Sequence, residues 1–232
     1  MLGSGPNRIG QGIEFDYCCV QAALAFREEN IETIMINSNP ETVSTDFDVS
    51  DKLYFEPIVA EDVFEIIRHE NPYGVVVQFG GQTPLKLTEV FEKNDIKILG
   101  TPPSSIDTAE NREKFKIFLS EFNFQQPENR IAQSVEDAKK AVEELSYPVI
   151  VRPSYVLGGR AMELIYTDSD LNNYLTNVAN ISAENPLLIE KFLDDAVELD
   201  IDVICDGEKT LIGGVLQHIE EAGIHSGDSS CS

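Results

Sequence analysis

The sequence has few cysteines, few basic residues and no long apolar run. The four cysteines lack a CxxC spacing and are too few for a disulfide scaffold in 232 residues. With 41 acidic against 17 basic residues, the formal net charge of -24 would repel a nucleic-acid backbone or an anionic lipid surface. No hydrophobic run is long enough to cross a bilayer. We therefore expect neither nucleic-acid nor membrane partners.

The amino-terminal residues MLGSGPN contain neither a charged segment nor an apolar stretch of the kind that directs secretion. We therefore predict a cytoplasmic location, where the cysteines would be reduced thiols. Cys18 and Cys19 lie in an apolar, helix-like run, and we interpret them as ordinary helix residues.

The first hundred residues alternate between helix-like and strand-like segments. This alternation is typical of an α/β fold with a doubly wound, parallel sheet. A glycine loop of the type at Gly3 should follow a strand, but only two residues precede it, so we expect the first strand to be truncated. The predicted helices are 14–30, 60–71 and 83–94, and the predicted strands are 31–37, 53–57, 73–81 and 96–100.

After residue 103 the pattern changes to short strands separated by helices. A glycine turn between two strands indicates an α+β fold with an antiparallel sheet. The predicted domains are therefore 1–103 and 104–232. In the second, we expect helices at 108–123, 134–145 and 168–180, with Ser134 as an N-cap, and strands at 129–133, 147–166, 186–192, 197–206 and 209–219.

The glycine loop at residues 3–12 resembles a dinucleotide site only superficially. Its spacing, G-x-G-x-x-x-x-G-x-G, departs from the G-x-G-x-x-G fingerprint, and Asn37 follows the second strand where an acidic ribose ligand would be expected. The sequence therefore argues against an NAD site. Arg8 suits either a small anion or solvent.

A second glycine turn, in VIVRPSYVLGGRAMELI, has strands on both sides and no G-K-[ST], so it is no P-loop. The glycines at 158 and 159 could let a hairpin close over phosphates, and Arg152 and Arg160 would add planar cations that suit phosphate oxygens. A plain turn remains the alternative reading.

The strand that follows alternates Glu198, Asp200 and Asp202 with apolar residues. This acidic face is either solvated or, at Glu198, able to accept hydrogen bonds from ribose hydroxyls. The backbone of Lys191 and Leu193 could contact an adenine edge.

The three histidines have different settings in the sequence. His225, in a polar, glycine-flanked loop beside Ser226, is a candidate phosphate contact. We expect His69 and His218 to be surface residues.

Six ordered segments closely resemble the carbamoyl phosphate synthetase large-chain family, in its second synthetase half. The form RPSYVLGGRAM distinguishes that half. The segments are GPNRIGQGIEFDYCCVQA, NSNPETVSTDFDVSDKLYFEP, QFGGQTPLKL, VRPSYVLGGRAM, LDDAVELDIDVICDG and HIEEAGIHSGDSSCS.

The resemblance implies a pre-ATP-grasp domain followed by the first part of an ATP-grasp domain. It implies transfer of a phosphoryl group from ATP to carbamate, for arginine and pyrimidine synthesis. Arg152 and His225 are the implied catalytic residues, and Arg112 is a further candidate phosphate ligand. The implied nucleotide contacts are Arg152, Lys191, Leu193, Glu198, Gly223, Ile224, His225 and Ser226. The residues implied near the end of a carbamate tunnel are Arg8, Gly12 and Glu14.

In the family, the ligands of Mg²⁺ or Mn²⁺ follow the last loop seen here, so we expect ATP to need metal ligands beyond residue 232. The implied partners are the remainder of the large chain and a small glutaminase subunit, and the fragment alone should be inactive. Two alternatives are another ATP-grasp ligase, such as biotin carboxylase, and a non-catalytic nucleotide-binding module.

Overall fold

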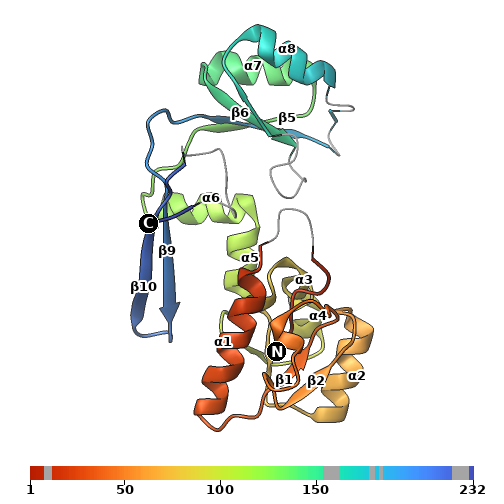
Figure 1. Ribbon diagram of the computed structural model, residues 1–232. Helices are drawn as coiled ribbons and strands as arrows, with labels where there is room; N and C mark the ends of the chain where they lie inside the picture. The colour runs from red at the N-terminus through yellow and green to blue at the C-terminus, as the bar shows by residue number, and fades with distance from the viewer. Residues whose placement is uncertain (8–11, 154–161, 178–180, 183–184, 221–229) are drawn as a thin grey trace. The chain divides into compact units, whose positions relative to one another are not determined.

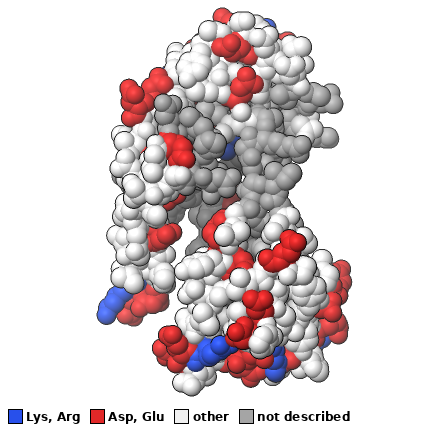
Figure 2. Space-filling view, viewed as in Figure 1, with Lys and Arg blue, Asp and Glu red and all other residues white. Residues whose placement is uncertain are grey.

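The computed structural model describes residues 1–7, 12–153, 162–177, 181–182, 185–220 and 230–232, with only the backbone at 112–113. It divides into two compact units, Met1–Asn123 and Phe124–Ser232 (Figure 1). Within the described residues, no helix is long and apolar enough to cross a membrane. Acidic side chains are spread over the visible surface of both units, as the sequence charge requires (Figure 2).

The sheet of the first unit is parallel, and residues 1–3 lie at its centre, between β1 and β3. Strand β1 (Ile34–Ile36) pairs with β2 (Lys52–Tyr54), and β3 (Val75–Val76) pairs with β4 (Ile98–Leu99). Leu2 joins the two pairs, because it forms a parallel bridge with Ile36 and its N–H donates to the Val76 carbonyl at 3.1 Å. The order β2–β1–(1–3)–β3–β4 confirms the predicted doubly wound sheet.

Two of the helices of this unit, α1 (Glu14–Glu28) and α2 (Ala60–Glu70), lie on opposite sides of the sheet (Figure 1). The predicted helix 83–94 is instead divided into α3 (Gln82–Leu85) and α4 (Thr88–Lys93). At the break, the Leu87 N–H donates to Pro84 and the Thr88 hydroxyl donates to Leu85, which tightens the turn. Helices α5 (Pro103–Glu110) and α6 (Arg112–Glu121), and the 3₁₀ turns η1 (Val43–Thr45) and η2 (Gln78–Gly80), complete the unit.

The second unit contains a four-stranded antiparallel sheet in the order β5–β8–β6–β7. Ser134 caps α7 as predicted, since its hydroxyl accepts the Asp137 N–H at 3.0 Å. Helix α7 and helix α8 supply buried side chains to the same core as one face of the sheet. The elements are β5 (Asn129–Ala132), α7 (Val135–Leu145), β6 (Val149–Pro153), β7 (Glu163–Ile165), α8 (Asp168–Asn177) and β8 (Leu187–Lys191).

A separate antiparallel hairpin of β9 (Leu199–Cys205) and β10 (Thr210–Gln217) follows, with a register shift between Ile212 and Gly214. Residues 230–232 add to its β10 side, because Gln217 and Ser232 exchange two backbone hydrogen bonds of 3.0 Å. His218 forms an antiparallel bridge with Cys231 in this short third strand.

Candidate functional site

Asn37, which is fully buried, packs against the start of the glycine loop of the first unit. Its side-chain oxygen accepts the Gly5 N–H at 3.1 Å, and its amide nitrogen donates to the hydroxyls of Thr42 and Ser44 at 3.3 and 3.1 Å. A Cβ at Gly3 would lie 2.5 Å from the Asn37 side chain. Asn37 thus packs tightly against Gly3 and links the described start of the loop to Thr42 and Ser44.

The other loop residues are only partly described. Gly12 precedes α1, and Glu14 is exposed at the first position of that helix, where a carboxylate suits the helix dipole. The prediction for Arg8 lies outside the described residues.

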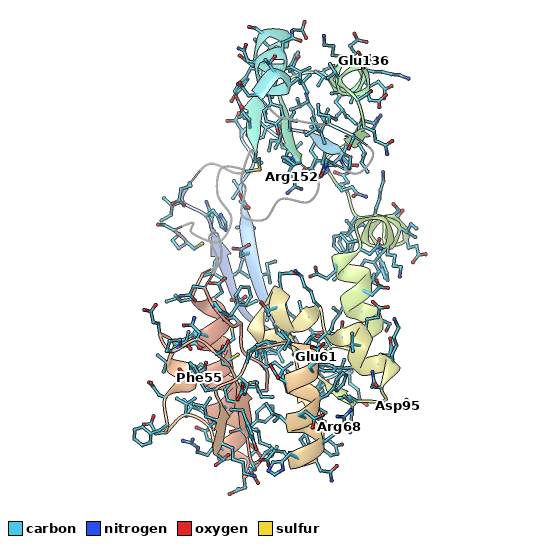
Figure 3. The ribbon with its side chains drawn as sticks, turned by 90° about the vertical axis from the view of Figure 1, so that its right-hand side faces the viewer. Phe55, Glu61, Arg68, Asp95, Glu136 and Arg152 are labelled. Carbon is cyan, nitrogen blue, oxygen red and sulfur yellow. The ribbon has the colours of Figure 1, made fainter. Side chains whose placement is uncertain are left out.

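The sheet of the second unit has one face in the core and one face turned away from it. Val149, Val151 and Ile189 are buried against α7 and α8. The alternating residues Arg152 and Glu190 therefore project from the opposite face. Figure 3 shows Arg152 on the side of the sheet away from α7, the helix that carries Glu136.

Arg152 is fixed on this face by one acidic partner. Its Nη2 lies 2.9 Å from Oε2 of Glu190, on the neighbouring strand β8. Its Nε is buried and has no hydrogen-bond acceptor within the described part of the chain. The guanidinium therefore keeps a desolvated donor, while 39% of the side chain stays exposed. The exposed part of the guanidinium is a planar cation of the kind that suits carboxylate or phosphate oxygens.

Lys191 and Leu193 line a common cavity of about 440 Å³. The Lys191 ammonium donates to the carbonyls of Ser146 and Tyr147 at 3.1 and 2.9 Å, and the Lys191 N–H donates to Glu128 at 2.8 Å. Lys191 is therefore a structural anchor of this edge, and its backbone N–H is already used. Leu193 is half exposed at the same cavity.

Glu198 lies immediately before β9, next to His218. The His218 N–H donates to the Glu198 carbonyl at 3.0 Å, and Nδ1 of His218 lies 3.8 Å from the Glu198 carboxylate. On the other side of the ring, Nε2 lies 2.8 Å from Oδ2 of Asp200. The hydrogen bond to Asp200 raises the pKa of His218 above its ordinary value, although burial opposes this.

The prediction that His218 is a surface residue is wrong, because only 3% of its side chain is exposed. The ring lies against Asp200 and Glu198, and His218 pairs with Cys231 of the third strand; these long-range contacts cannot be seen in the sequence. His69 is exposed, as predicted.

Several predicted contacts cannot be placed. The predictions for Gly223, Ile224, His225 and Ser226 lie outside the described residues, as do those for the glycine turn at 158–159 and Arg160. Arg112 begins α6, but its side chain is not described. The structure thus brings Glu198 together with His218 and Asp200, and places Arg152 on the face of the β5–β8–β6–β7 sheet that is turned away from α7 and α8.

Comparison with known proteins accounts for the whole chain. Residues 1–108 match the model of the carbamoyl phosphate synthase preATP-grasp domain, and residues 111–228 match that of the carbamoyl-phosphate synthase L chain, ATP binding domain. The chain belongs to the carbamoyl phosphate synthase large-chain family. The large chain of Haemophilus ducreyi is 59% identical over 232 residues, and that of Archaeoglobus fulgidus is 58% identical over 231. Each alignment covers 100% of this chain and 22% of the relative's length.

Similar solved structures show that this chain has the fold of ATP-grasp enzymes. N5-carboxyaminoimidazole ribonucleotide synthetase from Thermus thermophilus superposes with a TM-score of 0.68 at 16% identity, covering 97% of this chain and 56% of the other. The biotin carboxylase domain of the Hydrogenobacter thermophilus 2-oxoglutarate carboxylase gives 0.68 at 19% identity, covering 93% and 49%. The much higher identity to carbamoyl phosphate synthases separates this chain from the biotin carboxylase alternative.

Proposed function

We propose that this chain is part of the carbamate-phosphorylating half of a carbamoyl phosphate synthase. In that role it contributes one wall of the nucleotide site, in a longer ATP-dependent ligase that uses a small glutaminase subunit. Arginine and pyrimidine synthesis are the pathways it would serve in the cytoplasm. The supporting observation is the position of Arg152, within a family-specific segment and on the face of its sheet that is turned away from α7 and α8.

The chemistry of the step explains why an arginine is needed there. Phosphoryl transfer from ATP to carbamate brings two anions together, and its catalysis depends on alignment and charge neutralisation. Arg152 offers the phosphates a positive charge oriented by Glu190, on a side chain that is 39% exposed. Phosphate oxygens would accept from the exposed part of the guanidinium, while Glu190 keeps it oriented.

The remaining wall residues would hold the nucleoside. Glu198 would accept hydrogen bonds from the ribose hydroxyls. Because the Lys191 N–H already donates to Glu128, the adenine edge would meet the N–H of Leu193 and a carbonyl of this segment. Residues 223–226 would complete the phosphate contacts, and His225 would belong to the catalytic set. Arg112 is a further candidate phosphate ligand.

The other assignments extend the same proposal. Arg8, Gly12 and Glu14 would lie near the end of the route by which carbamate arrives. Mg²⁺ or Mn²⁺ would neutralise the transferring phosphates, held by ligands outside this sequence. We place the boundary between the pre-ATP-grasp and ATP-grasp domains at residues 103–104. The chain by itself should form no carbamoyl phosphate.

The experiment uses a full-length synthetase that carries this sequence, assayed for ATP formation from ADP and carbamoyl phosphate. Arg152→Ala should lower kcat by about 10²-fold, as expected for the loss of a donor aimed at developing charge. Arg130→Ala is the matched control, because Arg130 lies on β5 and is paired with Glu144 of α7 at 2.9 Å. Equal losses in the two variants would contradict the proposal.

The ribose contact predicts a different kinetic effect. Glu198→Ala should mainly raise the KM for ADP, because a ribose contact is similar in the ground and transition states. A large fall in kcat with KM unchanged would argue against this role for Glu198.

A further inference from the structure

A cluster of three different metal-ligating side chains lies on the three-stranded part of the second unit. Asp200 is in β9, His218 follows β10, and Cys231 is in the short third strand. His218 pairs directly with Cys231, so these two side chains leave the sheet on the same face. Asp200 reaches the same ring from the other side, because its carboxylate contacts Nε2 of His218.

The three donor atoms are close enough to share one ion. One ligand atom from each residue lies within 4.8 Å of the other two, and the Asp200–His218 separation is 2.8 Å. Zinc–ligand bonds of 2.0 to 2.3 Å correspond to donor separations of roughly 3.3 to 3.8 Å in a tetrahedral site. Small side-chain rotations of Asp200 and Cys231 would therefore bring all three donors into range.

We propose that Asp200, His218 and Cys231 bind one divalent cation of the zinc class. The set of one imidazole, one thiolate and one carboxylate suits zinc or cobalt better than Mg²⁺ or Ca²⁺, which prefer oxygen ligands alone. This site is separate from the metal that ATP requires and does not rest on the proposed function.

The local charge favours a cation. Besides Asp200, the carboxylates of Glu198 and Glu220 lie close enough to act on both His218 and Cys231. Burial, followed by these three carboxylates, raises the pKa of the Cys231 thiol. A bound cation would compensate the negative potential of these three carboxylates.

The surroundings of the imidazole also fit a metal ligand. When Nε2 coordinates the ion, Nδ1 faces the Glu198 carboxylate at 3.8 Å, the kind of outer carboxylate that commonly orients a ligating histidine. The His218 side chain is 3% exposed, whereas that of Asp200 is 61% exposed. Asp200 thus lies on the solvent side, where the ion could enter and a water molecule could complete the coordination.

The test is a titration of the chain with Co²⁺, followed by absorption. We expect one Co²⁺ per chain, with the visible bands of four-coordinate cobalt and a near-ultraviolet thiolate-to-cobalt band that Zn²⁺ abolishes. Cys231→Ser should remove the thiolate band. Cys205→Ser is the matched control, because Cys205 is an exposed thiol at the end of β9, and it should leave the spectrum unchanged.

A third variant tests whether the Asp200 carboxylate is a ligand. Asp200→Asn should weaken Co²⁺ binding by at least about tenfold, because one charged ligand is lost. The absence of a thiolate band in the unmodified chain would overturn the proposal. Persistence of that band in Cys231→Ser would do the same, since it would assign the thiolate to another cysteine.

Discussion

Replacing Asn37 with alanine should destabilise the first unit by about 3 kcal/mol. The buried side chain makes three hydrogen bonds, to the Gly5 N–H and to two hydroxyls. Each such bond contributes about 1 kcal/mol, and the Gly5 N–H would be left buried and unpaired. Asn94→Ala is the control, because Asn94 is exposed and makes a single side-chain bond, to the Val90 carbonyl.

Cys19 provides an assay that reports on this unit alone. It is fully buried, and its thiol should react only when the unit opens. In a background where Cys18, Cys205 and Cys231 are serine, a loss of about 3 kcal/mol should raise the labelling rate of Cys19 about 10²-fold. A rate within about twofold of the parent, or an equal rise in Asn94→Ala, would refute the role given to Asn37.

Three further predictions concern single residues. In the native chain, a thiol reagent should label Cys18 rapidly and Cys19 slowly. Cys18 is exposed, whereas burial raises the pKa of Cys19 to about 12. Equal labelling rates for the two thiols would contradict this prediction. The Asp200 hydrogen bond raises the pKa of His218, so it stabilises the folded chain while His218 is protonated. The urea midpoint of the parent should therefore exceed that of Asp200→Asn most clearly below pH ~6.5. This difference should decline as the pH rises through the raised pKa of His218. Ile189→Ala should cost about 2 to 5 kcal/mol of unfolding free energy in urea, and a change below about 0.5 kcal/mol would show that Ile189 is outside the core.

Periodic patterns in the sequence predict most of the helices and strands, because amphipathic spacing is a local property. Helix α7 and its Ser134 cap are predicted closely. The break between α3 and α4 was missed, because it depends on the bonds made by Leu87 and Thr88 within one turn. The sheet order β5–β8–β6–β7 could not be read from the sequence either, since neighbours in space are far apart along the chain.

A family motif can propose individual site residues, but it does not reveal their partners. The motif proposes Arg152, whereas Glu190 is 38 positions later along the chain, and only the pairing of β6 with β8 brings the two together. The surroundings of His218 also depend on long-range pairing, because Asp200 and Glu198 contact its ring and Cys231 pairs with it. Pairing between strands that are far apart in the sequence therefore determines the partners of these side chains, which the local sequence pattern does not predict.

The measurement that tests the central claim most directly compares two rates in a full-length synthetase carrying Arg152→Ala. One rate is overall carbamoyl phosphate synthesis, and the other is ATP formation from ADP and carbamoyl phosphate, which isolates the carbamate-phosphorylating site. Assignment of this chain to that site predicts that both rates fall together, by about 10²-fold. If ATP formation stays intact while overall synthesis is lost, Arg152 belongs to the other half of the enzyme and the assignment is wrong.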